Sequence, residues 1–273
     1  MVTVLDDIIV GVKEDMEARR RLVSPVELKD RVAAAAPARD AWAALGGPSA
    51  TREDLKVIAE IKRRSPSKGD LAPIEDPASL AAQYEDGGAS VISVLTEQRR
   101  FGGSLADLDA VRATVNIPLL RKDFTVDEYQ IWEARAHGAD LILLIVAALS
   151  DAQLADYSAL SRELGMNVLV ETHTEQEIER AVAANARIIG VNVRNLKTLD
   201  VDRSLFASLA GLIPAEAVIV AESGVRSADD VSHYAASGAN AILVGEALVS
   251  DATPRERINE FKAAGAAAIA VRN

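Results

Sequence analysis

Cysteine is absent from this chain of 273 residues. Without thiols the protein can form no disulfide, no thiolate metal site and no cysteine nucleophile. Histidine is scarce as well, with three residues in the whole sequence. Any catalysis therefore has to depend on Lys, Glu, Asp, Asn, Arg and Ser side chains.

Positive charge is in deficit, because 30 Lys and Arg residues face 41 Asp and Glu residues, for a net charge of -11. A protein that binds nucleic acid without sequence preference needs a basic surface that displaces counterions from the phosphates. We therefore expect no nucleic-acid partner.

Long hydrophobic runs are also lacking. The longest, Leu141–Leu149, is too short to cross a bilayer. The first residues carry Asp6 and Asp7 where a secretory signal would be basic. These features predict a cytoplasmic protein with no membrane partner.

What the sequence does contain is a series of short apolar runs separated by segments with helical patterning. With 49% hydrophobic residues the chain can bury one large core, although two ordinary domains are also possible at this length. The runs are apolar throughout rather than alternating, as in parallel strands covered by helices on one face. We place eight strands near residues 57–61, 90–95, 117–121, 140–146, 167–171, 187–193, 217–222 and 240–244. Their number predicts an α/β fold, a single-domain (β/α)8 TIM barrel.

A weak repeat precedes several of these strands. Gly88, Gly138 and Gly238 are each followed by alanine, one polar residue and an apolar run, and Asn185 begins a degenerate copy. A helix closed by Gly or Asn in the left-handed conformation and followed at once by a strand is an αβ turn. The repeat therefore predicts repeated βα units. Helix starts are marked by Asp76-Pro77 and Thr253-Pro254, and by capping-box patterns. The boxes pair Thr125 with Glu128, Ser150 with Gln153, Thr174 with Glu177 and Thr253 with Glu256.

About fifty residues precede the first strand and are not required by an eight-unit barrel. Residues 2–21 have the pattern of an amphipathic helix, and Ser24-Pro25 opens a second helix that ends before Pro37. We predict an N-terminal helical extension over 1–50, packed on a catalytic barrel domain over 51–273. The extension could plug one end of the barrel or form a lid over an active site.

Polar residues end most of the predicted strands. Glu60 and Lys62 are two residues apart, as are Asn192 and Arg194, so each pair projects from one face of its strand. Lys122, Glu171 and Glu222 also lie at strand ends. All strand ends of a parallel barrel face one pocket, so these residues predict a composite active site. The alternative is a buried ion-pair network that serves stability alone.

Two further segments suggest that the pocket binds phosphate. Ser223 and Gly224 follow the seventh strand, and Gly245 and Glu246 follow the eighth, where barrels commonly bind phosphate. Small residues let backbone N–H groups approach an anion, and a short helix beginning near Glu246 would add its positive end. The Glu246 side chain would then have to point away from the anion. Plain turn geometry is the alternative explanation for the glycines.

The loop after the first strand, residues 63–69, is basic in a strongly acidic protein. That contrast suggests steering of an anionic substrate, although a solvated turn would have the same composition. Phe101, after the second strand, could form an aromatic wall of the pocket or belong to the core. Of the histidines, only His173 is expected at the pocket end. It has no second ligand at suitable spacing, so we predict a loop residue and no metal site.

Four motifs at strand ends give the chain a resemblance to a known family. Residues Glu60–Ser67, Leu119–Phe124, Ile189–Leu196 and Ala221–Gly224, in this order, resemble indole-3-glycerol phosphate synthase. The resemblance covers nearly the whole chain, including the N-terminal helices. It implies a carboxy-lyase of tryptophan biosynthesis whose substrate is 1-(2-carboxyphenylamino)-1-deoxyribulose 5-phosphate. This anionic small molecule is closed to indole-3-glycerol phosphate with loss of carbon dioxide and water, and no cofactor is implied.

The resemblance also implies a role for each polar strand end. Lys122 would be the general acid of the condensation, and Glu171 the general base. Lys62 would hold the substrate carboxylate and serve as a candidate acid for dehydration, with Glu60 tuning it. By the same resemblance, Asn192 and Arg194 would position the substrate, and Glu222 would form a further polar wall. The phosphate would be contacted by Ser65, Ser223, Gly224, Gly245 and the Glu246 backbone N–H. The aniline ring would be lined by Phe101 and Phe124.

Other functions fit the same pocket. A phosphate-binding barrel could be an isomerase of a ribosyl-amine phosphate, an aldolase that uses Lys122 as a Schiff base, or a flavin-binding enzyme. A barrel that binds a phosphorylated metabolite without converting it is the non-enzymatic alternative.

Overall fold

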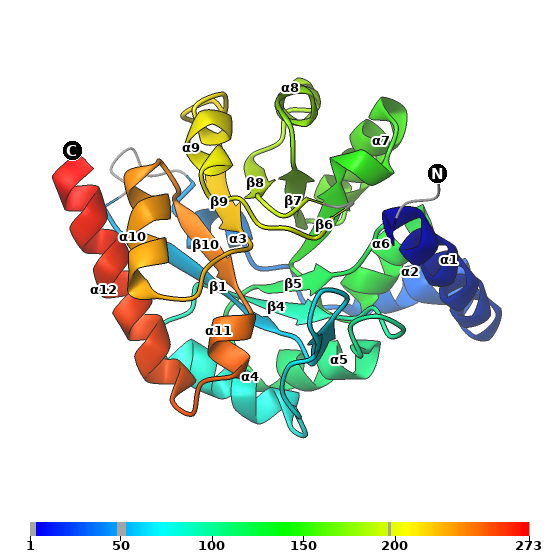
Figure 1. Ribbon diagram of the computed structural model, residues 1–273. Coiled ribbons are helices and arrows are strands. Elements are labelled where there is room, and N and C mark those ends of the chain that lie inside the picture. The colour runs from blue at the N-terminus through cyan, green and yellow to red at the C-terminus, as the bar shows by residue number, and fades with distance from the viewer. Residues whose placement is uncertain (1–3, 48–52, 196–197, 273) are drawn as a thin grey trace.

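The computed structural model describes residues 4–47, 53–195 and 198–272. Eight parallel strands close into a barrel in the order β1-β10-β9-β8-β7-β6-β5-β4, with helices around the outside (Figure 1). The strands are β1 (Lys56–Ile61), β4 (Val91–Leu95), β5 (Leu119–Lys122), β6 (Leu141–Ile145), β7 (Asn167–Thr172), β8 (Ile188–Asn192), β9 (Val218–Glu222) and β10 (Ala241–Val244). The predicted TIM barrel is confirmed, and each predicted strand lies within two residues of an observed one.

A helix or helical turn follows each barrel strand. These elements are α4 (Pro77–Asp86), α5 (Leu105–Thr114), α6 (Glu128–Ala136), η1 (Val146–Ala148) with α7 (Asp151–Glu163), α8 (Glu175–Ala183), α9 (Leu205–Ala210), α10 (Ala228–Ala236), and α11 (Glu246–Val249) with α12 (Pro254–Arg272). Among the described residues, no helix is long and apolar enough to cross a membrane.

The residues predicted to close the helices before strands adopt the left-handed conformation. Gly88 has φ +82°, Gly138 +80° and Gly238 +106°, and Asn185 has φ +55°. Each ends a helix and turns the chain into the next strand, so the repeat in the sequence corresponds to repeated βα units.

The core has two parts, because alternate strand residues face opposite sides. Ile58, Leu120 and Leu143 point into the barrel and pack with the other inward residues. Their neighbours Val57, Leu119 and Leu144 point outward into the larger cluster between strands and helices. The barrel interior is thus filled with aliphatic side chains below the polar strand ends.

Several helix starts differ from the predictions. α6 begins at Glu128 with Asp127 as its N-cap, so the Thr125 box is wrong. Asp127 is also a good capping residue and lies closer to the helix. Ser150 and Gln153 do form a reciprocal box at α7. At α8 the Thr174 side chain caps the helix as predicted. The Glu177 carboxylate, however, accepts from the backbone N–H of His173 rather than from that of Thr174, so the predicted reciprocal box is incomplete.

The first βα loop contains a small antiparallel hairpin that the sequence did not indicate. Its strands are β2 (Arg64–Ser65) and β3 (Gly69–Asp70). The hairpin brings Ser65 and Ser67 to the barrel mouth, where both line the cavity described below.

The N-terminal extension consists of α1 (Val4–Leu22), α2 (Pro25–Ala34) and α3 (Ala41–Ala44). The side chains of Ala41 and Leu45 join the interior cluster, and the backbone N–H of Trp42 donates to Oδ1 of Asn167, the first residue of β7, at 3.1 Å. α3 therefore covers the amino ends of the strands.

α1 lies near the opposite end of the barrel. Leu5 and Ile8 line the cavity at the carboxyl ends of the strands, and α2 packs on α6. The extension thus contacts both ends, where a plug and a lid were expected as alternatives. The predicted domain boundary between residues 50 and 51, and the predicted helix start at residue 2, lie outside the described residues.

Candidate active site

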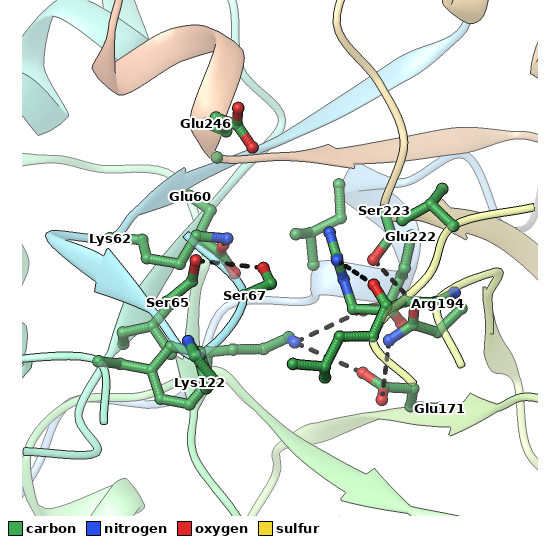
Figure 2. A pocket seen from close by; sticks show the side chains of 18 of the residues that line it. Glu60, Lys62, Ser65, Ser67, Lys122, Glu171, Arg194, Glu222, Ser223 and Glu246 are labelled. Carbon is green, nitrogen blue, oxygen red and sulfur yellow. Dashed lines mark hydrogen bonds and ion pairs between the residues drawn. The ribbon is translucent and has the colours of Figure 1, made fainter. Parts of the chain in front are cut away.

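A cavity of about 440 Å³ opens at the carboxyl ends of the barrel strands (Figure 2). All the site residues predicted from the sequence line it: Glu60, Lys62, Ser65, Phe101, Lys122, Phe124, Glu171, Asn192, Arg194, Glu222, Ser223, Gly224, Gly245 and Glu246. The structure therefore brings together residues from seven strand ends and their loops. The roles suggested for them stay predictions.

Lys122, the last residue of β5, reaches two carboxylates across the cavity. Its Nζ lies 3.4 Å from Glu171 Oε2 and 3.6 Å from Glu222 Oε2 (Figure 2). Burial alone would lower the pKa of this ammonium, but the charge of Glu171, the largest opposing cause, acts with that of Glu60 and the pKa is raised above its usual value. Lys122 is therefore a cation at neutral pH, with its proton directed into the cavity.

Glu171, near the end of β7, is held by partners on both of its oxygens. Its Oε2 faces Lys122, while its Oε1 accepts from Asn192 Nδ2 at 3.1 Å. Asn192 Oδ1 in turn accepts from Ser223 Oγ at 2.8 Å. Burial would raise the pKa of Glu171, but Lys122, together with His173 and Asn192, outweighs it and holds the pKa well below its usual range. Glu171 is thus an oriented, ionised base.

Glu222, the last residue of β9, has the opposite environment. It is 2% exposed, and its Oε1 has no hydrogen-bond partner among the described residues. Burial, followed by the charge of Glu171, raises the pKa of Glu222 to about 8. The pKa values of two neighbouring carboxyls are thus shifted in opposite directions, an arrangement that keeps one in its acid form and the other in its base form within one site.

Gly190 on β8 provides the space for the Glu222 carboxyl. Gly190 is paired with Glu171 in the β7–β8 register, and a Cβ there would lie 2.0 Å from Glu222 Oε1. No real Cβ contact is that short, so any larger residue would force Glu222 out of position.

Lys62 and Glu60 form an ion pair on the other side of the cavity, with Nζ and Oε1 2.5 Å apart. A Cβ on Gly245 would lie 2.6 Å from the same Glu60 oxygen. The glycine after β10 therefore lets this pair lie beside the start of α11.

The loops after β9 and β10, where phosphate binding was predicted, line one part of the cavity. Ser223 and Gly224 both have positive φ, +70° and +80°, and Gly245 is the N-cap of α11. The Glu246 side chain forms an ion pair with Lys68 of the first βα loop. Successive backbone N–H groups in such turns, with Arg194 and Arg226 also lining the cavity, suit an anion.

Phe101 and Phe124 form the aromatic side of the cavity, with ring centroids 6.0 Å apart. Phe101 is placed by Glu97, whose buried carboxylate accepts from the backbone N–H groups of Arg99, Arg100 and Phe101 at 2.7–3.0 Å. A flat aromatic ring could lie against this wall.

Several lining residues were not predicted from the sequence, namely Leu5, Ile8, Ser67, Lys68 and Arg226. The basic loop composition pointed toward Lys68, but nothing in the sequence placed α1 at the cavity. His173 is also more than a loop residue, because its ring lies between Glu171 and Glu177. Within the described part of the chain, no group of three or more potential ligands could hold a metal ion.

Comparison with solved structures supports the fold. The chain is similar to 3-hexulose-6-phosphate synthase from Salmonella typhimurium, with a TM-score of 0.63, 14% identity and coverage of 80% of this chain and 100% of the other. A thiamine phosphate pyrophosphorylase from Pyrococcus furiosus has a TM-score of 0.61 at 13% identity, covering 80% and 98% of the two chains. At these identities the likeness concerns the fold alone.

Comparison of sequences is more specific. The chain is 88% identical to indole-3-glycerol phosphate synthase of Paenarthrobacter aurescens over 271 residues, which cover 99% of this chain and 100% of the relative. It is 62% identical to the Micrococcus luteus protein of the same description, with 96% and 98% covered. The family model described as indole-3-glycerol phosphate synthase matches residues 5–261. With this match over nearly its whole length, the chain belongs to the indole-3-glycerol phosphate synthase family.

Proposed function

We propose that this indole-3-glycerol phosphate synthase, a carboxy-lyase of tryptophan biosynthesis, acts on 1-(2-carboxyphenylamino)-1-deoxyribulose 5-phosphate with Lys122 as acid and Glu171 as base. The observation that carries the assignment is the part-buried contact of Lys122 Nζ with Glu171 Oε2. An ammonium and a carboxylate side by side in the cavity lining support a paired proton donor and acceptor.

The first step joins the aromatic carbon that bears the carboxylate to the ketone carbon of the sugar. As that bond forms, the C=O π electrons move to oxygen, and Lys122 donates its proton there. The raised pKa of Lys122 keeps this proton in place until negative charge develops on the oxygen. Carbon dioxide then leaves, and the electrons of the broken C–C bond restore the aromatic ring.

The second step removes water. Loss of the new hydroxyl, with a proton supplied to it, and removal of a proton from the neighbouring carbon form the ring double bond. Glu171 is the base we assign to this step. Once Lys122 has lost its proton, the largest of the charges that lower the pKa of Glu171 is gone, so Glu171 becomes a stronger base when one is needed. Lys62, with Glu60 as its partner, is the candidate acid for the departing hydroxyl.

The remaining contacts would hold the substrate by its two charged ends. Lys62, Lys122 and Arg194 are a basic cluster in an acidic protein and suit a ligand with a carboxylate and a phosphate. The turns at Ser223-Gly224 and at Gly245 would accept the phosphate, with Ser65 and the Glu246 backbone N–H. The Phe101 and Phe124 rings would contact the aniline ring, and Asn192 and Glu222 would complete the polar wall.

The proposal is tested by incubating the protein with this substrate and following indole fluorescence. Lys122→Met and Glu171→Gln should each lower kcat by about two orders of magnitude or more if they act as acid and base. Lys13→Met, at an exposed position of α1, is the matched control and should keep the wild-type rate. Wild-type kcat in either site variant would refute its assigned role.

A further inference from the structure

His173 occupies a half-buried position that the proposed mechanism does not use. It follows β7 directly, two residues after Glu171, and its side chain is 9% exposed. Its Nε2 lies 3.3 Å from Glu171 Oε1, and its Nδ1 lies 3.1 Å from Glu177 Oε2. The imidazole therefore lies between the candidate base and a second carboxylate outside the cavity lining.

The start of α8 fixes this arrangement. Thr174 caps the helix by accepting from the Glu177 backbone N–H at 3.2 Å. The Glu177 carboxylate then turns back and accepts from the His173 backbone N–H at 2.8 Å, while it also contacts the ring. One carboxylate thus binds both the backbone and the side chain of His173, so the ring has little freedom to rotate.

The contact of His173 falls on one particular oxygen of Glu171. Oε1 accepts a hydrogen bond from Asn192 Nδ2 and lies at ion-pair distance, 3.3 Å, from His173 Nε2, which has no hydrogen-bond partner in the described part of the chain. Oε2 accepts from Lys122 Nζ at 3.4 Å. Partners on both oxygens restrict rotation about the terminal torsion of Glu171, which is otherwise broad, so Oε2 keeps its direction toward Lys122.

We propose that His173, held by Glu177, is a positioning residue that fixes the Glu171 carboxylate through Oε1 and so directs Oε2 toward Lys122 and the substrate. The inference rests on the proposed role of Glu171 as base. Burial lowers the pKa of the imidazole, but the facing carboxylates of Glu171 on β7 and Glu177 on α8 outweigh it and raise the pKa to about 10. His173 is then cationic at neutral pH and adds to the positive charge that keeps Glu171 ionised.

Three variants separate orientation from charge. His173→Ala should lower kcat about tenfold to a hundredfold, because the carboxylate loses its fixed direction, while KM changes less than about threefold. It should also move the acidic limb of the kcat/KM profile to higher pH, since Glu171 loses a neighbouring cation. His173→Gln supplies a neutral donor and should recover most of kcat but not the position of the acidic limb. Glu177→Gln should reproduce part of both effects.

The matched control is His137→Ala. His137 also pairs with a carboxylate, with Nδ1 2.7 Å from Asp109 Oδ1, but it lies at the end of α6 and does not line the cavity. It should keep wild-type kcat and pH profile. A His173→Ala enzyme with wild-type kcat and acidic limb would overturn the proposal.

Titration of the imidazole by NMR tests the same contact without activity and without the alanine variant. In the wild type the His173 ring should stay protonated well above pH 7, and Glu171→Gln should lower its pKa whether or not that variant is active. Protonation of His173 only below pH 7 would overturn the assigned charge, even if His173→Ala does not fold. Retained activity in Glu171→Gln would instead refute the base role, while leaving the measured contact in place.

Discussion

Replacement of Glu222 by glutamine should change stability relative to the wild type in a pH-dependent way, with the difference moving in favour of the glutamine variant as pH rises. Glu222 is fully enclosed by the barrel end, and its Oε1 has no partner among the described residues. Burial and the charge of Glu171 raise the pKa of Glu222 to about 8, with Lys122 acting in the opposite direction. The folded protein therefore keeps this carboxyl protonated at pH 7.

The sign follows from proton binding in the two states. In the unfolded chain the carboxyl ionises near its ordinary pKa of 4.5, whereas the folded state holds its proton up to about pH 8. Between these values the folded state binds more protons, so wild-type stability falls as pH rises, by about 1.4 kcal/mol per pH unit. Glutamine cannot ionise. The difference in the free energy of unfolding between Glu222→Gln and the wild type should therefore grow by about 2 kcal/mol from pH 6 to pH 8, because Glu222 and Glu171 titrate together. Above pH 8 this difference should level off.

The assay is thermal unfolding of both proteins at pH 6, 7, 8 and 9. For a chain of this length, about 2 kcal/mol corresponds to a growth of about 3 °C in the Tm difference. His173, whose pKa is raised to about 10, also loses stabilising charge as pH rises, but it does so in both proteins and cancels in the difference.

Glu216→Gln is the matched control, at an exposed position just before β9, and its Tm difference should change little with pH. A Glu222→Gln difference that stays flat, or that shrinks as pH rises, would show that Glu222 is ionised in the folded state and would refute the reasoning.

Three further results are expected. Gly190→Ala puts a methyl group 2.0 Å from Glu222 Oε1, so kcat should fall at least about tenfold in a folded protein, and an unchanged kcat in steady-state assays would contradict this steric argument. Arg121→Met leaves the buried carboxylate of Asp123 without its cation and removes one of the cations that pair with Glu133. The free energy of unfolding, measured with urea, should fall by about 3–5 kcal/mol. A fall below about 1 kcal/mol would contradict the importance of this ion pair. Gly224→Ala forces a side chain into φ +80° in a turn assigned to phosphate, so KM should rise with kcat within about threefold, whereas an unchanged KM would argue against phosphate binding there.

Much of the fold was predictable because local patterns encode it. Short apolar runs, left-handed glycines before strands and capping residues each depend on a few neighbouring residues. Where two local signals competed, the prediction failed, as at α6, whose cap is Asp127 rather than Thr125. The hairpin of β2 and β3 was missed because two-residue strands leave no periodic pattern.

The candidate site was predictable for a related reason. A parallel barrel places all strand ends at one mouth, so Glu60, Lys122, Glu171 and Glu222 could be assigned to one cavity before any distance was known. Resemblance to a family then supplied the reaction. Arg121 shows the limit of such reasoning: it also ends a strand, but points outward into a buried ion pair with Glu133, because neighbouring strand residues face opposite sides.

The number of βα units, the polar ends of the strands and the family could thus be inferred from the sequence alone. Which polar groups touch one another depends on the tertiary structure. Closure of the barrel fixes the register that sets Asn192 beside Glu222 and Gly190 beside Glu171. Burial and the charges of Lys122 and Glu171 then shift the pKa values of the two carboxyls in opposite directions. α1 reaches the cavity for the same physical reason. Contacts between residues distant in sequence depend on how whole elements pack, and no local pattern records that packing.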